Sequence, residues 1–255
     1  MVDPNRENRE VELKFAFDLA DADALIAHLG LGDAPATRRL ISVYFDTPDQ
    51  ALRKAGFSLR VREEGGRWTQ TVKSISAWSS AGRGEWEAPV DSGSPDPELL
   101  QSTPVGAVLH GLALEPLFTV SVERLSVTLR EAGSTVEVSV DKGEATRAGR
   151  SSAFGDLELE LKLGKAATLF AFAGQLRKAF AMRVSFTTKA DRGFALMDKK
   201  GPPGRRFRVP ALEREMTAGA AFKTIALATL KQIAGNAEDL RESIVIARLM
   251  TKLRE

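Results

Sequence analysis

The sequence contains no cysteine among its 255 residues, which excludes a disulfide framework, a thiolate zinc site and a cysteine nucleophile. It has only two histidines, His28 and His110. Both lie in apolar, helix-like stretches, where packing or surface roles are commoner than catalysis. A histidine triad or a histidine metal cage is therefore not expected.

Long apolar runs and an excess of one charge are missing as well. No segment approaches the length of a membrane span, and the polar start MVDPNRENRE lacks the apolar core of a secretory signal. We therefore expect a cytoplasmic protein, monomeric or homodimeric, with no membrane partner. The 36 basic and 34 acidic residues leave a net charge of +2, so no nucleic-acid partner is expected and any anion site must be local.

The stretch EVELKF near the start alternates charged and apolar residues. Read with a period of two, Glu10, Glu12 and Lys14 point to one side of a strand and the apolar residues to the other. The same split recurs in VEVSVD, with Glu137 and Asp141, and in LELELKL. In LELELKL the charged residues are Glu158, Glu160 and Lys162.

Gly65-Gly66 separates two alternating runs, which predicts a hairpin over residues 57–74. With this loop, Glu64 faces Arg67, and the register then pairs Arg62 with Thr69, Arg60 with Thr71 and Ser58 with Lys73. Arg60, Arg62 and Lys73 thus share one face, and Leu59, Val61 and Val72 share the other.

Several charged strand faces side by side leave two alternatives open. In the first, the charged faces meet water and the apolar faces form a core under helices. In the second, the sheet curls so that its charged face lines an interior, which avoids unfavourable like-charge neighbours at a solvated surface. Arginines and lysines there would hold phosphate oxygens, and clustered carboxylates would hold Mg²⁺ or Mn²⁺. The ligand expected in that case is a chain of several phosphates.

The pattern predicts an α+β protein with an antiparallel sheet and helices outside it. Strands are expected at residues 41–46, 84–90, 118–131, 134–143, 155–163 and 182–189, besides the opening strand and the hairpin. Helices are expected at residues 18–30, 47–56, 103–112 and 166–180.

These residues resemble the CYTH domains, or triphosphate tunnel metalloenzymes, over residues 8–198. The family's E-x-E-x-K motif stands here as Glu10, Glu12 and Lys14. Further matching blocks, in order, are YFDTPD (Tyr44 to Asp49), Leu59-Arg60-x-Arg62, Lys73, Arg83 with Glu85 and Glu87, Arg124, Glu137 with Asp141, Glu158 with Glu160, and Lys189 with Arg192. The resemblance implies a closed eight-stranded antiparallel β-barrel that binds triphosphate and hydrolyses or rearranges it with a metal.

The resemblance also implies roles for single residues. The metal, Mg²⁺ or Mn²⁺, would be held by Glu10, Glu12, Glu158 and Glu160, with Asp141 as a ligand of a second metal or of water. The phosphate chain would be bound by Lys14, Arg60, Arg62, Lys73, Arg124, Lys189 and Arg192. The catalytic candidates are Tyr44, Lys73, Glu85 and Glu87; for Tyr44 a packing role is the alternative.

The resemblance divides the chain into a CYTH domain over residues 1–203 and a linker with a helical segment over residues 204–255. The stretch TAGAAFKTIALATLKQIAGNAEDLRE predicts an amphipathic helix that is similar to the first helix of a CHAD domain, a polyphosphate-binding module. The chain ends without the basic helix and the further helices of that module, so we expect a partial CHAD-like segment. We favour a packing role for it, because one helix with little positive charge makes a poor polyanion site.

Three activities within the family compete. Hydrolysis of inorganic triphosphate needs only the shared tunnel residues and is our first expectation. Thiamine triphosphatases carry a tryptophan where Ser58 stands here, and a class IV-type adenylate cyclase needs a base pocket that we cannot identify. A non-catalytic polyphosphate-binding module is the fourth alternative, and the many carboxylates argue against it.

Overall fold

The computed structural model describes residues 11–31, 37–74, 84–131, 133–198, 210–230 and 232–233. The chain divides into two compact units. The first comprises Met1–Val184 and Thr188–Leu196, and the second comprises Ser185–Thr187 and Met197–Glu255. The domain boundary expected after residue 203 stays a prediction.

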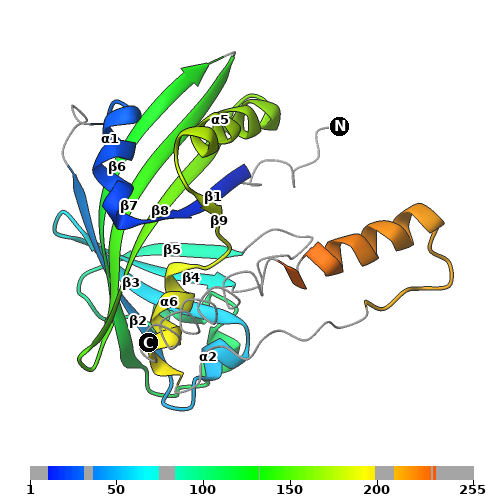
Figure 1. Cartoon of the computed structure of the whole chain (residues 1–255). Coiled ribbons are helices and arrows are strands. Elements are labelled where there is room, and N and C mark those ends of the chain that lie inside the picture. Colours follow the sequence, from blue (N-terminus) through cyan, green and yellow to red (C-terminus); the bar gives the residue numbers. More distant parts are fainter. Residues whose placement is uncertain are drawn as a thin grey trace, which may run out of the picture. The chain divides into compact units, whose positions relative to one another are not determined.

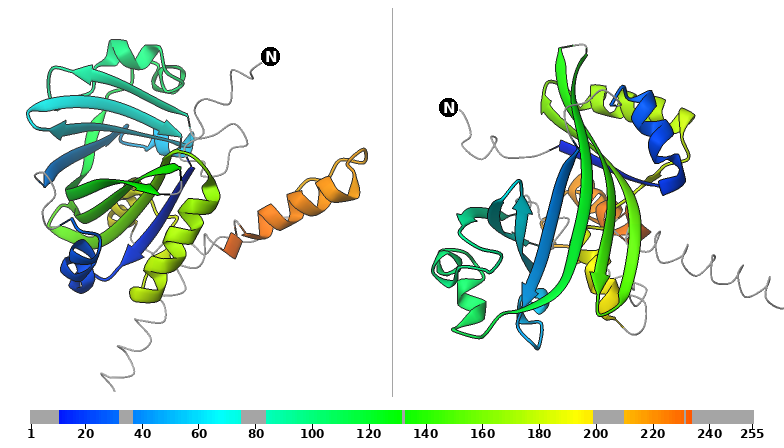
Figure 2. Two further views of the ribbon diagram at one scale, coloured as in Figure 1. Left: turned by 90° about the horizontal axis from the view of Figure 1, so that it is seen from above. Right: turned by 90° about the vertical axis from the view of Figure 1, so that its left-hand side faces the viewer.

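The first unit is built on one antiparallel sheet of nine strands, in the order β5-β4-β3-β2-β6-β7-β8-β1-β9 (Figure 1). Within the described residues β5 and β9 are the two edges of this sheet and are not paired with each other. The closed eight-stranded barrel is therefore not confirmed: the sheet has a ninth, two-residue strand and is open. The strands nevertheless bend strongly (Figure 2). Their bounds are β1 Val11–Phe17, β2 Arg38–Asp46, β3 Phe57–Glu64, β4 Arg67–Ser74, β5 Glu85–Val90, β6 Glu115–Glu131, β7 Ser134–Arg147, β8 Arg150–Leu163 and β9 Arg183–Val184.

The predicted hairpin register is confirmed. Glu64 pairs with Arg67, Arg62 with Thr69, and Ser58 with Lys73, because two glycines with positive φ form the loop between β3 and β4. The pairing of the other strands extends this register, so that every candidate acid and base on a described strand lies on the same side of the sheet. We call this side the charged face; it carries Lys14, Arg60, Arg62, Lys73, Glu87, Arg124, Asp141, Asp156 and Glu158.

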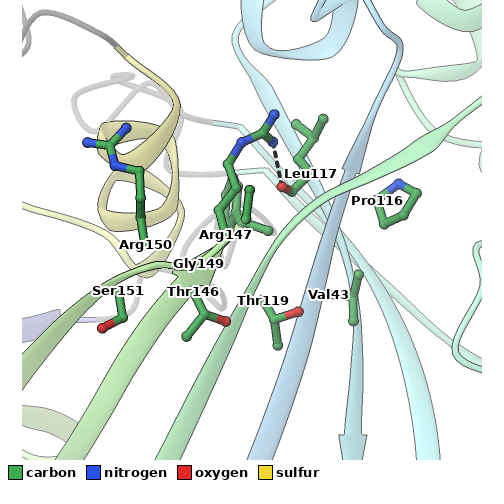
Figure 3. A pocket seen from close by; sticks show the side chains of 11 residues that line it. Val43, Pro116, Leu117, Thr119, Thr146, Arg147, Gly149, Arg150 and Ser151 are labelled. Carbon is green, nitrogen blue, oxygen red and sulfur yellow. Dashed lines mark hydrogen bonds between the residues drawn. The ribbon is translucent and has the colours of Figure 1, made fainter.

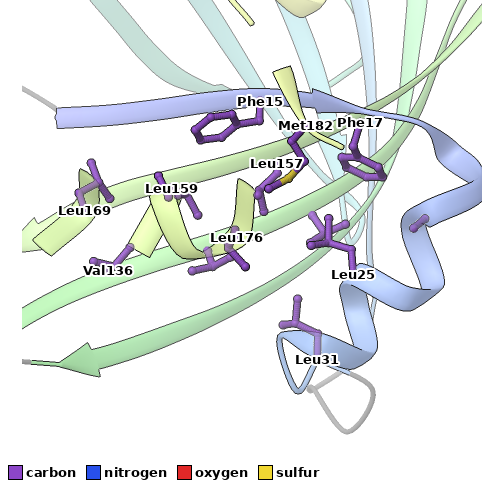
Figure 4. Packing of buried hydrophobic residues seen from close by; sticks show 14 residues of the cluster. Phe15, Phe17, Leu25, Leu31, Val136, Leu157, Leu159, Leu169, Leu176 and Met182 are labelled. Carbon is purple, nitrogen blue, oxygen red and sulfur yellow. The ribbon is translucent and has the colours of Figure 1, made fainter. Parts of the chain in front are cut away.

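The opposite, apolar face is covered by helices, as the sequence predicts. Where β1, β7 and β8 meet, Phe15, Leu157 and Leu159 pack against Leu25 of α1 and Leu176 of α5 (Figure 4). The side chains of this cluster are buried, and their removal from water contributes about 25 cal/mol per Å² of apolar surface. The helices are η1 Leu19–Asp21, α1 Ala22–His28 and α5 Ala166–Ala179.

A second apolar cluster covers β2, β3 and β4, where three short helices pack against residues such as Leu59 and Val72. The expected helix over residues 47–56 is shorter than predicted. The buried carboxylate of Asp46 accepts hydrogen bonds from the backbone N–H groups of Leu52 (2.8 Å) and Arg53 (2.9 Å), which fixes the helix start at Ala51. One of these helices, α3, is missing from the sequence prediction. They are α2 Ala51–Lys54, α3 Pro97–Gln101 and α4 Gly106–Leu109.

The strand expected at residues 182–189 is wrong over most of its length. Only Arg183–Val184 pairs with β1, and helix α6 (Lys189–Met197) begins where the strand was expected to end. Thr188 and Asp191 cap this helix reciprocally: the Thr188 N–H donates to Asp191 Oδ2 (2.8 Å), and the Asp191 N–H donates to Thr188 Oγ1 (3.1 Å). The helix lies on the charged face, since Phe194 packs edge-to-face on Phe118.

In the second unit, residues 218–230 are helical, as predicted for this part of residues 217–242; residues 231 and 234–242 of the predicted helix lie outside the described residues. Phe222, Ile225 and Leu230 of this helix are exposed. Across the ranges that the structure describes, no helix combines the length and the apolar character needed to span a membrane.

Candidate functional site

Two arginines of β3, which we call the arginine pair, lie on the charged face without a close counter-ion; Arg60 is buried and Arg62 is half-buried. Arg60 is 8% exposed, and its nearest carboxylate, Glu87, is 3.8 Å from Nη2. The Nε atoms of Arg60 and Arg62 have no hydrogen-bond partner among the described residues. Burial and the neighbouring Arg60 lower the pKa of Arg62 to about 10. A cation that is removed from water and poorly paired is costly, so an anion bound here would be favoured.

The ion-pair cluster lies on the same face, on β1, β6, β7, β8 and α6. At its centre, the fully buried Asp141 accepts two hydrogen bonds from Arg124, both of 2.6 Å, and pairs with the Lys189 ammonium at 2.8 Å. Burial alone would favour the neutral acid, but Lys189 and Arg124 outweigh it and hold the pKa of Asp141 below its usual range. The cluster comprises Lys14, Arg124, Asp141, Asp156, Glu158, Lys189 and Arg192.

Glu158 joins three of the cluster's cations. Lys189 lies 2.8 Å from its carboxylate, Arg124 donates to its other oxygen, and Lys14 is 3.9 Å away. Burial opposes ionisation of Glu158, but Lys189, Arg124 and Lys14 together lower its pKa. In return, Glu158 and Asp141 overcome the effect of burial and raise the pKa of Lys189. Asp141 and Glu158, two of the five acids that were predicted to bind metal, are therefore neutralised by protein cations in this structure.

Asp156 belongs to the cluster and was missed in the sequence analysis. Its side chain is fully buried and pairs with Lys14 at 3.0 Å and with Arg192 at 2.6 Å. The signal for it is strand alternation, because Asp156 stands two residues before Glu158 and so on the same face of β8.

A divalent metal would fit one row of the charged face. Glu160 of β8 lies in register between Glu12 of β1 and Glu137 of β7. Lys162 pairs with Glu160 at 2.6 Å and with Glu137 at 3.3 Å, and these pairs overcome burial to raise its pKa. No group of three acidic or imidazole side chains in the described ranges is placed to hold a metal alone. Mg²⁺ commonly binds one or two carboxylates together with substrate phosphates, and the carboxylates of this row are ligands of that type.

Glu10, predicted as a further metal ligand, and Arg83 lie outside the described residues.

Lys73 and the two acids of β5 lie together at the other side of the charged face. Lys73 pairs with Glu85 at 2.7 Å, and Glu87 accepts a hydrogen bond from Thr71 at 3.0 Å. The pKa of Glu85 is held low by Lys73 against the effect of burial. This side of the face is therefore mixed in charge, with a lysine that already has an acidic partner.

Tyr44, the chain's only tyrosine, is 4% exposed and stacks on Phe118 at a centroid distance of 4.7 Å. Lys73, another of the catalytic candidates, pairs with Glu85. The contacts of Tyr44 thus support the packing alternative.

A cavity of about 550 Å³ opens beside the arginine pair. Arg62, Glu64, Arg67 and Glu87 contribute its charged lining. A second pocket of about 530 Å³ lies on the other side of the sheet, since Val43, Thr119, Thr146 and Ser151 are in register there (Figure 3). Arg147 at its rim donates to the Leu117 carbonyl at 2.6 Å, and none of the predicted site residues lines it. The cavity beside the arginine pair is therefore the candidate site.

A comparison with known proteins matches the CYTH domain model over residues 8–194. The inorganic triphosphatase of Haemophilus influenzae is 27% identical over 205 residues, which is 75% of this chain. The chain spans 56% of the length of that relative.

Solved structures share the fold. A candidate adenylate cyclase from Bacillus halodurans aligns with a TM-score of 0.52 at 21% identity, covering 72% of this chain and 97% of its own. A candidate adenylyl cyclase from Hippeastrum, described as having a dominant triphosphatase activity, aligns with a TM-score of 0.53 at 17% identity, covering 73% and 95%. Because the matched model extends over most of the chain, the protein belongs to the CYTH domain family.

Proposed function

We propose that this protein hydrolyses inorganic triphosphate to pyrophosphate and phosphate in a metal-dependent reaction on the charged face. The observation that carries the proposal is the arginine pair: the Nε atoms of Arg60 and Arg62 have no hydrogen-bond partner among the described residues, and Arg62 lines a cavity of about 550 Å³. Guanidinium groups bind phosphate oxygens in bidentate fashion, and a linear polyanion supplies the negative charge that the protein does not. The triphosphatase relative from Haemophilus influenzae supports the choice of substrate.

The substrate's phosphates would be held from two sides. Arg60 and Arg62 would bind from β3, with Lys73 beside them on β4. Lys14, Arg124, Lys189 and Arg192 would bind from the ion-pair cluster, where the phosphate chain would compete with the carboxylates of Asp141, Asp156 and Glu158. Groups fixed in this way orient the chain for attack by water and stabilise the charge of the transition state.

Glu12 and Glu160 are the residues that would hold Mg²⁺ or Mn²⁺, with Glu10 as a further candidate and Asp141 as a candidate for a second ion. The bound metal would neutralise phosphate oxygens and polarise the phosphoryl group. The cation pairs of Asp141 and Glu158 argue that these two acids position Arg124 and Lys189 first and reach a metal only if those pairs rearrange.

Proton transfer falls to the groups beside the arginine pair. Lys73, Glu85 and Glu87 are the candidates, because Lys73 and Glu85 already share a 2.7 Å ion pair through which a proton can be held. Tyr44 is the weakest of the catalytic candidates, since its ring packs on Phe118.

The test is phosphate release from triphosphate, thiamine triphosphate and ATP with Mg²⁺ or Mn²⁺, with cyclic AMP measured in parallel. We expect triphosphate to be cleaved much faster than either organic substrate. Cyclic AMP formation would instead indicate a cyclase, and preferred turnover of thiamine triphosphate would indicate a thiamine triphosphatase. Binding of triphosphate without turnover would indicate a binding module and would overturn the proposal.

A further inference from the structure

Arg38 is a cation of the charged face that the proposed substrate site does not yet use. It begins β2 directly opposite Arg124 of β6, so its side chain shares the face of the ion-pair cluster. Its side chain is 46% exposed and makes two long hydrogen bonds: Nη1 donates to Glu64 Oε1 and Nη2 to Ser126 Oγ, both at 3.3 Å.

Two serine hydroxyls join Arg38 to the cluster. Ser126 Oγ lies 2.9 Å from Ser139 Oγ, and Ser139 stands opposite Glu158 in the pairing of β7 with β8. Arg38 therefore stands on the strand next to Arg124 and contacts, through Ser126, the row of residues that leads to Glu158.

Glu64, the partner of Arg38, lines the cavity beside the arginine pair. The same cavity continues from Arg62 to Gly65 and Arg67 at the β3–β4 loop. It thus extends past the arginine pair toward the end of the sheet where Arg38 and Arg67 stand. A phosphate chain that lies along Arg62 and runs toward Arg67 would therefore pass Glu64, the partner of Arg38.

The Arg38–Glu64 pair is easily exchanged. Both side chains are two-fifths exposed or more, and such pairs contribute little to stability. A phosphate group offers more negative charge than one carboxylate and suits the arginine fork. Glu64 can therefore hold Arg38 in the free protein and give it up when a phosphate arrives.

We propose that Arg38, released from Glu64, binds the outermost phosphate of linear polyphosphates longer than triphosphate. This outer subsite, formed by Arg38 and Glu64, would make inorganic tetraphosphate a better ligand than triphosphate. The inference rests on the proposed function only in placing the first three phosphates along the arginine pair and the ion-pair cluster.

The test is calorimetric titration of triphosphate and tetraphosphate into the protein in EDTA, so that binding is measured without turnover. Arg38→Ala should weaken tetraphosphate binding about tenfold and triphosphate binding by less than about twofold, because one charged hydrogen-bonded contact is lost. The matched control is Arg39→Ala, whose exposed side chain lies on the other face of β2, and it should change neither affinity. An equal loss for both ligands, or no loss for tetraphosphate, overturns the outer subsite.

A second variant tests the exchange itself. Glu64→Gln removes the competing charge and should strengthen tetraphosphate binding about threefold, since an exposed ion pair of this kind is a weak competitor. Unchanged or weaker binding would overturn the exchange. The binding measurement separates this inference from the proposed function. If Arg38→Ala weakens tetraphosphate binding more than triphosphate binding, but the parent protein hydrolyses neither, the proposed hydrolase activity is overturned and the outer subsite is supported.

Discussion

Arg124 donates two parallel hydrogen bonds of 2.6 Å to Asp141, from Nε and from Nη2. The Asp141 side chain is fully buried and the Arg124 side chain is 17% exposed, so neither charge can turn freely to water if the other is lost. This pair connects β6 to β7, and Asp141 also pairs with Lys189 of helix α6. It makes the stability of the protein depend on the same groups that are proposed to bind substrate.

Asp141→Asn should therefore destabilise the protein by about 3 kcal/mol, because it leaves Arg124 and Lys189 buried with one carboxylate fewer. Urea denaturation followed by circular dichroism measures this. The exposed Asp91→Asn removes the same charge from the surface and should change the free energy of unfolding by less than about 0.5 kcal/mol. Equal stability of the two variants would contradict the ion-pair cluster.

The pH dependence of stability follows from the same groups. The pKa values of Asp141 and Glu158 are lower in the folded protein than in the unfolded chain, where such groups titrate near about pH 4. Below that pH the unfolded chain binds protons that the folded protein does not, so the free energy of unfolding should fall as the pH falls. Tm measured from about pH 6 down to about pH 3 should drop, and the drop should be smaller in Asp141→Asn, which lacks one of the two groups. A Tm that rises on acidification would exclude these ion pairs.

Arg62→Ala separates a binding role from a structural one. No carboxylate in the described part of the chain lies close enough to form an ion pair with Arg62, so its removal should leave stability unchanged or raise it. Triphosphate affinity should fall about tenfold or more, because a charge-assisted bidentate contact is lost. Thermal unfolding and calorimetric titration on the same sample check both statements. A less stable variant with normal affinity would show that the arginine pair is structural.

Strand pattern and register were largely predictable from the sequence, because alternation has a period of two and Gly65-Gly66 fixes the hairpin loop. At residues 182–189 the alternation predicted a strand, and only Arg183–Val184 forms one. There the pattern continues after Val184, but the reciprocal cap between Thr188 and Asp191 starts a helix instead. The Thr-x-x-Asp spacing is a helix-start signal that should have outweighed the alternation.

The partners of the charged residues could not be predicted. Alternation places Asp141 and Glu158 on one face, and the sequence suggested a crowded acidic site open to metal. In the structure Lys189 reaches both acids from α6, far away in the chain, and balances their charge. Which charges meet depends on how distant segments pack, and one sequence carries no direct record of that.

Tyr44→Phe tests whether the tyrosine takes part in chemistry. The ring keeps its stacking on Phe118, so stability should be retained, and kcat for triphosphate should change by less than about twofold if the residue only packs. Loss of a proton-transfer group would lower kcat by about 100-fold or more. Lys73→Met is the companion variant: it breaks the ion pair with Glu85 and should lower kcat by that larger factor. A large decrease of kcat in Tyr44→Phe would show that the hydroxyl takes part in catalysis.

The position of α6 can be tested at a glycine. A Cβ atom on Gly193 would come within 2.0 Å of the Phe118 ring, which is itself 4% exposed and stacked on Tyr44. Because the ring has no free space to move into, Gly193→Ala should destabilise the protein by about 1–3 kcal/mol and displace α6. Lys189 and Arg192 sit on this helix, so triphosphate binding should weaken with it.

Gly174→Ala is the matched control for that change. Gly174 also lies in a helix, α5, but is exposed, and a Cβ there would meet nothing within 4 Å. Its replacement should stabilise the helix by about 0.5–1 kcal/mol and leave triphosphate affinity unchanged. Urea denaturation and calorimetric titration of both variants give the comparison. If Gly193→Ala matched Gly174→Ala in stability and affinity, α6 would not pack on Phe118, and Lys189 and Arg192 would lose their proposed place in the site.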